Sequence, residues 1–289
     1  MGCHLRETIK MKLLYPLAKR FNAGHDFESE KPVIKKLMDD GYEVSVDYLG
    51  ELSKTEEDCE QAKEQYIQII KHFRHEKIDI SIKPSQLGLL ISPAICLQHL
   101  EKIAVCAKVC GHTIRLDMED SKVTEHTKKM AIFLNKEFEN IGVAIQANLL
   151  RTEKDLNDLV SNNVSVRLVK GAYKENKEIA YQNSFDIGSC FFAHAAHLYS
   201  ERANKPAIAT HDEELLEDIE ELIPNPDYFD YEFLYGIRRD LQKDFKDNGH
   251  RVRIYVPFGT DWLPYTMRRL KEWKNLKFVI YNVFKEWFK

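Results

Sequence analysis

The chain has 289 residues, of which 44% are hydrophobic and 30% charged, and its formal net charge is -4 at pH 7. This length suits two average domains or one α/β barrel of about 250 residues. The slightly acidic charge argues against a general nucleic-acid binder, which is normally basic. The longest apolar run, at residues 87–97, contains Ser92 and Pro93 and is too short to span a bilayer.

Eight short runs with β-strand character recur along the chain. In order they are YEVSVDYLG (42–50), IDISIKPS (78–85), HTIRLDMED (112–120), GVAIQANLL (142–150), VSVRLVKGAY (164–173), KPAIATHD (205–212), DYEFLYGI (230–237) and VRIYVPFG (252–259). Charged segments with helical periodicity, such as residues 56–77 and 121–142, lie between most of them. Strands that alternate with helices predict a parallel sheet, and eight such units predict a closed (βα)8 barrel of the TIM type. The crossovers before the last two strands are short, which leaves closure there open.

We expect one domain over residues 1–289, with leading helices up to about residue 40 and an amphipathic helix at residues 275–289. The first 21 residues lack the apolar core and cleavage site of a signal peptide. The cysteines form no C-x-x-C pair, and their spacing indicates neither a zinc site nor a disulfide framework. A reducing compartment, the cytoplasm in the simplest case, and no bound metal are therefore expected. The cysteines are Cys3, Cys59, Cys96, Cys106, Cys110 and Cys190.

The predicted strands carry a polar face. In TIRLDMED (113–120) and DISIK (79–83), apolar and polar side chains alternate. Barrel strands that are buried on both faces normally form nearly continuous apolar runs. We therefore expect apolar side chains to meet the helices and charged ones to point toward the barrel axis, where each needs an ion pair or a polar ligand. Polar groups near the carboxyl ends of five or six strands favour an active site, because barrel active sites form there.

The stretch WLPYTMRRL (262–270) contains an adjacent arginine pair. Asp261 is a suitable N-cap for a helix, and Tyr265 lies three and four residues before Arg268 and Arg269, so the three side chains can share a helical face. Taken alone, this pattern favours a solvated basic face. The chain contains no G-x-S-x-G, H-E-x-x-H, P-loop or G-x-G-x-x-G motif, so any redox cofactor would bind outside a Rossmann-type site.

A set of motifs occurs in order at the ends of the predicted strands. They are VDYLGE, ISIKPSQLG, IRLDMED, IQANL, VRLVKGAY, ATHD and RIYVPFGTDW followed by YTMRRLKE. Together they resemble the proline dehydrogenase family, from FNAGHDF at residue 21 to the arginine pair. The resemblance implies a (βα)8 barrel that binds FAD and oxidises L-proline to Δ1-pyrroline-5-carboxylate by hydride transfer from ring C5 to flavin N5. It also implies a membrane quinone as electron acceptor and a separate pyrroline-5-carboxylate dehydrogenase that receives the product.

The resemblance implies a substrate site built around cations. Arg268 and Arg269 match the arginines that clamp the proline carboxylate, a task suited to bidentate guanidinium groups. Lys83 matches a third carboxylate partner, and Glu51 matches a residue that pairs with the first arginine and gates the site. The residues that match the walls around the pyrrolidine ring are Tyr173, Leu234, Tyr255 and Tyr265. Fitting Leu234 to the family pattern requires a gap or a shifted register in DYEFLYGI.

The resemblance also implies a cofactor site. Arg167 matches an arginine close to flavin N5, where positive charge stabilises the anionic reduced flavin, and Gln146 matches a partner of the pyrimidine ring. Asp117, also expected among the cofactor-binding residues, matches an acid that links substrate-side groups by hydrogen bonds. The remaining cofactor-side matches are Lys170, Gly171, Ala172, Thr210, His211 and Glu272. The expected catalytic set is Lys83, Asp117, Arg167, Tyr255, Arg268 and Arg269, and the base that deprotonates the substrate amine is not identified.

Two other functions remain open. Lys83 or Lys170 could form a Schiff base in an aldolase or lyase barrel, because a strand-end lysine with a depressed pKa serves that chemistry. Alternatively, the barrel could bind flavin without turnover. The apolar stripe of residues 275–289 also has two interpretations: packing on the barrel, which is favoured, or peripheral contact with the inner face of the membrane.

Overall fold

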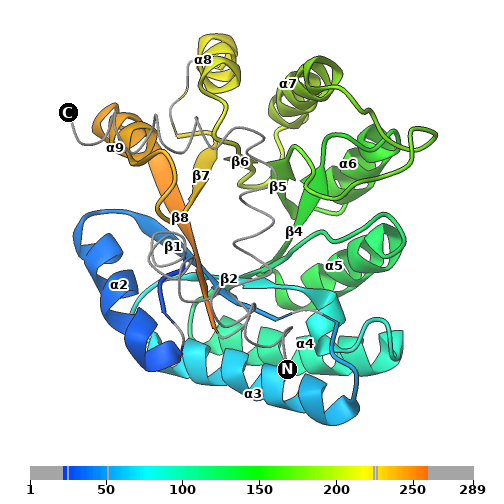
Figure 1. Ribbon diagram of the computed structural model, residues 1–289, viewed down its shortest axis with the longest axis vertical. Helices are drawn as coiled ribbons and strands as arrows, with labels where there is room; N and C mark the ends of the chain where they lie inside the picture. The colour runs from blue at the N-terminus through cyan, green and yellow to red at the C-terminus, as the bar shows by residue number, and fades with distance from the viewer. Residues whose placement is uncertain (1–21, 25, 51, 224, 226, 260–289) are drawn as a thin grey trace, which may run out of the picture.

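In the computed structural model, which describes residues 22–24, 26–50, 52–223, 225 and 227–259, eight parallel strands close into a barrel. Neighbouring strands pair in sequential order and β8 returns to β1, with the helices in a ring around them (Figure 1). The strands are β1 Glu43–Tyr48, β2 Asp79–Ile82, β3 Thr113–Leu116, β4 Ile141–Gln146, β5 Ser165–Val169, β6 Ala207–Ala209, β7 Asp230–Leu234 and β8 Arg251–Phe258. The helices are α2 Phe27–Asp39, α3 Glu56–His72, the 3₁₀ helix η1 Pro84–Leu87, α4 Pro93–Val109, α5 Thr124–Phe138, α6 Thr152–Ser161, α7 Ser184–Ser200, α8 Glu213–Leu222 and α9 Arg239–Asp247. The predicted (βα)8 barrel is confirmed.

The barrel closes despite its short final crossovers. The helices before β7 and β8, α8 and α9, have ten and nine residues. A ten-residue helix spans about 15 Å and a five-residue strand about 17 Å, so helices of this length suffice to return the chain along one strand. The register confirms closure, because Glu43 to Tyr48 of β1 pair one by one with Arg253 to Phe258 of β8.

Capping residues fix where α2 and α3 begin. The Thr55 hydroxyl accepts a hydrogen bond from Asp58 N at 3.1 Å, and the Asp58 carboxylate accepts one from Thr55 N at 3.0 Å. Asp26 and Ser29 form the same reciprocal pair before α2. Acidic residues in the first turn of each helix interact favourably with the positive end of its dipole. Helix α2 is thus the described part of the predicted leading helices.

The two faces of each strand differ as the alternation predicted. In β2, Ile80 and Ile82 are fully buried in the hydrophobic core, where the outer face of the barrel wall meets the helices. Asp79 and Ser81, the residues of opposite phase, are also buried but make hydrogen bonds with other strands across the barrel. The interior of this barrel is therefore a polar network enclosed by an apolar wall.

Several predicted features lie outside the described residues. They are the first part of the leading helices (1–21) and the amphipathic tail (275–289), whose two interpretations remain predictions. Within the ranges that the structure does describe, no helix combines the length and the apolar character needed to cross a membrane.

A buried carboxyl group lies on the barrel-facing side of α2. Glu30 is fully buried, one turn before the equally buried Ile34, and neither of its carboxyl oxygens has a hydrogen-bond partner in the described part of the chain. Burial, with a further contribution from the negative charge of Asp47, raises the pKa of Glu30 well above its usual range. An unsatisfied buried polar group of this kind is a source of instability.

We expect Glu30→Met to raise the free energy of unfolding by about 1–3 kcal/mol, because methionine fills similar space without a polar group. The pKa of Glu30 is raised in the folded state, so wild-type stability falls as pH rises above the unfolded value, and the gain should be larger at pH 8 than at pH 5. Urea unfolding at both pH values measures this. Glu28→Met, on the exposed side of α2, is the control, and a loss of stability in Glu30→Met would contradict the expectation.

Candidate active site

The site residues that were predicted within the described ranges lie at the carboxyl ends of the strands. Four strands are followed directly by a predicted site residue: β2 by Lys83, β3 by Asp117, β5 by Lys170 and β6 by Thr210. The others are Gln146 and Leu234, which end β4 and β7, Tyr255 in the second half of β8, Arg167 inside β5, and Gly171, Ala172, Tyr173 and His211 in the loops. Parallel strands bring their carboxyl ends to one rim, so residues far apart in sequence meet there.

The Lys83 ammonium group is surrounded by acidic and phenolic oxygens. Its Nζ donates to both carboxylate oxygens of Asp47, at 2.7 and 2.9 Å, and lies 3.5 Å from the Tyr255 hydroxyl. The nearer oxygen of Asp117 lies 3.7 Å away. Asp47 is fully buried and Lys83 nearly so. This pairing holds the lysine charge at a defined point in the mouth of the barrel.

Asp117 links the tyrosine to the arginine. Its Oδ2 accepts a hydrogen bond from the Tyr255 hydroxyl at 2.6 Å, and its Oδ1 accepts one from Arg167 at 2.7 Å. The guanidinium of Arg167 also lies over the Tyr255 ring, 5.3 Å from its centre. Desolvation of the phenol, then the negative charges of Asp117 and Asp47, raise the pKa of Tyr255 well above its usual range. Tyr255 is therefore kept as a hydrogen-bond donor.

The ends of β4 and β5 form a second group of polar residues. Gln146 donates to the Glu119 carbonyl oxygen at 3.0 Å, and the backbone N–H of Asn148 donates to the Lys170 carbonyl oxygen at 3.1 Å. Gly171 adopts a φ of +110°, and a Cβ there would lie 2.2 Å from Asn148 Oδ1, so both conformation and space require glycine. Among the residues that the structure describes, no donor reaches this buried Asn148 oxygen. An open acceptor beside a glycine turn is suited to binding a ligand.

The ends of β6 and β7 are joined through His211. Its Nε2 accepts a hydrogen bond from Leu234 N at 3.0 Å. Thr210 accepts one from Asp212 N at 3.3 Å, and the Asp212 carboxylate forms an ion pair with Lys170. The backbone of Leu234 pairs in register with Tyr255, so the two residues share a level and a face of the barrel.

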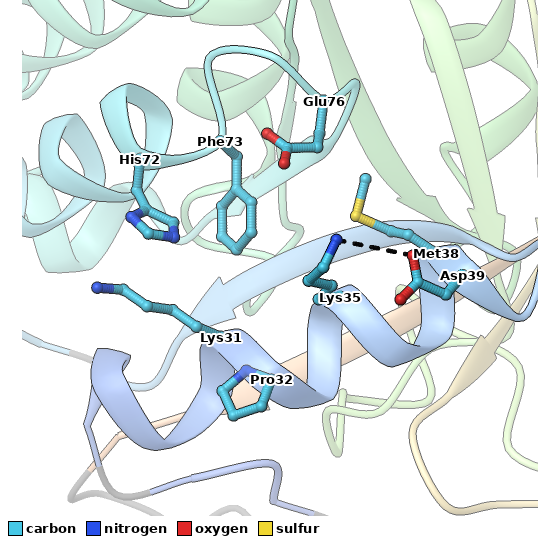
Figure 2. A pocket seen from close by; sticks show the side chains of 8 residues that line it. All are labelled: Lys31, Pro32, Lys35, Met38, Asp39, His72, Phe73 and Glu76. Carbon is cyan, nitrogen blue, oxygen red and sulfur yellow. Dashed lines mark ion pairs between the residues drawn. The ribbon is translucent and has the colours of Figure 1, made fainter.

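Five predicted site residues lie outside the described residues, and their roles remain predictions: Glu51, Tyr265, Arg268, Arg269 and Glu272. The described residues also form a surface pocket of about 200 Å³ between α2 and the end of α3, lined by Lys31, Lys35, His72 and Phe73 among others (Figure 2). This pocket lies outside the barrel wall and contains none of the strand-end residues. It is therefore separate from the candidate site.

Comparison with known proteins assigns the chain to a family. The family model for proline dehydrogenase matches residues 31–279. Over 276 residues the chain is 34% identical to proline dehydrogenase 1 of Bacillus subtilis subsp. natto, covering 93% of this chain and 91% of that protein. The chain belongs to the proline dehydrogenase family. It is accordingly an oxidoreductase that acts on proline, in the first step of proline catabolism.

Further similarities agree with this family membership. Over 291 residues the chain is 32% identical to proline dehydrogenase of Deinococcus radiodurans, covering 96% of this chain and 94% of that protein. A crystal structure of proline utilization A from Bdellovibrio bacteriovorus, inactivated by N-propargylglycine, superposes with a TM-score of 0.84 at 24% identity. The match covers 92% of this chain and about a third (33%) of that longer one, and it shows a shared fold.

Sequence reasoning missed several polar residues of this family member's barrel. Asp47 holds Lys83, and Glu232 contacts Arg167, yet neither was predicted as a site residue. Asn148 and Glu119, within the quoted motifs IQANL and IRLDMED, were also passed over. The signal for Asp47 and Glu232 was present, since both have the inward phase of the strand alternation.

Proposed function

We propose that this protein oxidises L-proline to Δ1-pyrroline-5-carboxylate with FAD as its resident cofactor and a membrane quinone as electron acceptor. The observation that carries the proposal is the cluster of Lys83, Asp47, Asp117, Tyr255 and Arg167 at the mouth of the barrel. It combines a fixed cation for a substrate carboxylate with a tyrosine and an arginine that share one acid. With two cations beside two carboxylates, such a set suits a small zwitterion.

On the substrate side, Lys83 provides an ammonium group for the proline carboxylate, and Asp47 keeps it in place. In the proposal, Arg268 and Arg269 complete the carboxylate clamp and Glu51 gates it. The ring walls are Tyr173, Leu234, Tyr255 and Tyr265. Fixing a small ring in one orientation, with water excluded, lowers the entropic cost of reaching a reactive geometry.

On the cofactor side, the residues present fit a flavin dinucleotide. Gly171 makes room for the Asn148 side chain, whose buried Oδ1 has no donor among the described residues, and Lys170 and Arg167 supply positive charge for anionic groups. When bound, FAD would accept the hydride removed from the substrate ring. The other residues proposed to hold it are Asp117, Gln146, Ala172, Thr210, His211 and Glu272. Arg167, held by Asp117, places positive charge beside the site.

We also propose a cytoplasmic protein that works next to the inner face of a membrane and hands its product to a separate pyrroline-5-carboxylate dehydrogenase. The proposed quinone acceptor implies such a location, because an acceptor dissolved in the membrane must be reached from its surface. The aromatic and lysine-rich sequence of residues 275–289 suits such a contact.

An anaerobic titration with L-proline tests the proposed function. We expect a yellow protein whose visible flavin absorbance is bleached by proline and unaffected by prolinamide, which lacks the carboxylate. A yellow protein that proline does not bleach would support the binding-only alternative. A colourless protein that borohydride labels at Lys83 or Lys170 in the presence of a carbonyl substrate would support the lyase alternative.

A further inference from the structure

Beneath the mouth of the barrel, Arg167 is enclosed by acceptors from several strands. Its side chain is 3% exposed. Besides Asp117, it donates to Ser81 at 3.0 Å, Ser45 at 3.1 Å and Asp79 at 3.3 Å. Its Nε forms an ion pair with Glu232 of β7, a charge contact in which the two atoms are not aligned for a hydrogen bond. Arg167 therefore cannot turn without breaking contacts to β1, β2 and β7 and to the residue that follows β3.

Glu232 differs from the other acids because it contacts two arginines at once. One of its carboxylate oxygens contacts Arg167 Nε, and the other accepts a hydrogen bond from Arg253 at 2.7 Å. Arg253 also pairs with Asp230 at 2.6 Å and with Glu43 at 2.5 Å, which are the first residues of β7 and β1. Glu232 thus bridges Arg167 and Arg253, and through Arg253 it connects the site to the ion pairs of Asp230 and Glu43.

The pKa shifts of the two arginines also single out Glu232 among the acids. Burial would lower the pKa of Arg167, but the negative charges of Glu232, Asp117 and Asp79, in that order, raise it above its usual value. For Arg253, burial again lowers the pKa and Glu232 is again the strongest opposing charge. These charges are buried away from bulk water and therefore interact more strongly than exposed ones, so the electric field of Arg167 at the rim depends on how Glu232 is shared.

We propose that Glu232 is a positioning residue for the redox reaction: by bridging Arg167 and Arg253 it fixes the Arg167 guanidinium and sets how much of its positive charge acts on the flavin. The inference rests on the proposed function, which assigns Arg167 to the flavin. Arg253 draws part of the Glu232 charge away from Arg167. Removing Glu232 and removing Arg253 should therefore change the midpoint potential of the flavin in opposite directions.

The first test is Glu232→Gln, which removes the charge and keeps the shape. We expect the equilibrium constant for flavin reduction to rise about tenfold, which is about 30 mV in midpoint potential for a two-electron couple. The affinity of the oxidised flavin for sulfite, which forms an anionic adduct, should rise in parallel. Arg253→Gln should lower both quantities, because the charge of Glu232 then acts on Arg167 alone. Both are measured on bound flavin without turnover.

The matched control is Asp230→Asn. Asp230 lies two residues earlier on β7, is similarly buried and pairs with Arg251 and Arg253, both at 2.6 Å. We expect it to lower stability about as much as Glu232→Gln while shifting the potential much less. Glu232→Asp, which keeps the charge, should restore most of the wild-type potential.

Unchanged potential and sulfite affinity in a flavin-loaded Glu232→Gln variant would overturn the inference, as would an equal shift in Asp230→Asn. If Glu232→Gln does not fold, Arg253→Gln still decides, since a rise or no change in its potential contradicts the bridge. A wild-type protein that takes up no flavin would instead reject the proposed function, and that result is distinguishable because it appears before any substitution is made.

Discussion

Replacing Arg167 by methionine is expected to destabilise the fold by about 3–5 kcal/mol, the range found when one partner of a buried ion pair is removed. The substitution would leave Asp79, Asp117 and Glu232 facing one another without their shared cation. Because protonation relieves that repulsion, the deficit should be smaller at pH 5 than at pH 8. Urea unfolding at the two pH values measures both effects.

Arg251→Met is the control for this substitution. Arg251 is also on a barrel strand and bonds Asp230 at 2.6 Å, but its side chain is 37% exposed. The Arg251 side chain reaches solvent and Asp230 would keep Arg253 as a partner, so we expect a change below about 1 kcal/mol. Two outcomes would contradict this expectation: equal losses of unfolding free energy in the two variants, or a loss in Arg167→Met that does not change with pH. Either would show that Arg167 is not needed to neutralise the interior carboxylates.

The second large effect concerns Asp79 and acid stability. Burial alone would raise the pKa of Asp79, but Arg115, Arg253 and Arg167, with a hydrogen bond from Thr113, lower it from 3.8 to about 2. The folded-state pKa lies below the unfolded one, so the carboxylate stabilises the fold fully above about pH 4 and loses this effect as pH falls toward 2. At neutral pH the contribution is roughly 2–3 kcal/mol.

We therefore expect Asp79→Asn to be less stable than wild type by that amount at pH 7, with a difference that shrinks as pH falls from about 4 to about 2. Comparing the two proteins at each pH cancels the titration of the remaining carboxylates. The measurement is urea unfolding at pH 7, 4 and 2.5. A constant difference over the three pH values would show that Asp79 acts through packing and hydrogen bonding rather than charge.

The architecture could be predicted from the sequence because the alternation of the strands and the helical periodicity of the segments between them are both visible in it. Strand alternation fixed which side chains point inward, and the order of the polar strand ends placed Lys83, Asp117 and Tyr255 on one rim, where they are in contact. The fit of DYEFLYGI to the family pattern required a gap or a shifted register, and the role of Leu234 stays a prediction. What the structure adds is that Leu234 pairs with Tyr255. That pairing depends on the stagger between two strands, which no single segment encodes.

Partnerships inside the barrel could not be predicted for the same reason. Asp47 and Glu232 have the inward phase, but whether each meets a lysine, an arginine or a serine depends on the relative heights of strands that are distant in sequence. Glu30 is a different case. Helical spacing puts it in line with Ile34, yet a glutamate in the first turn of a helix is normally read as a solvated residue. Only tertiary packing makes it a buried acid.

The seam between β1 and β8 has a consequence for how the chain acquires its structure. The paired residues are separated by about 210 positions, for example Glu43 and Arg253, and contacts at such a separation form late because a long loop must close first. During synthesis, the edge of β1 that pairs with β8 therefore stays unpaired until almost the whole barrel has been translated. Asp47 on β1 and Tyr255 on β8 flank Lys83 from the two sides of this seam, so the site is assembled only when the last strand docks.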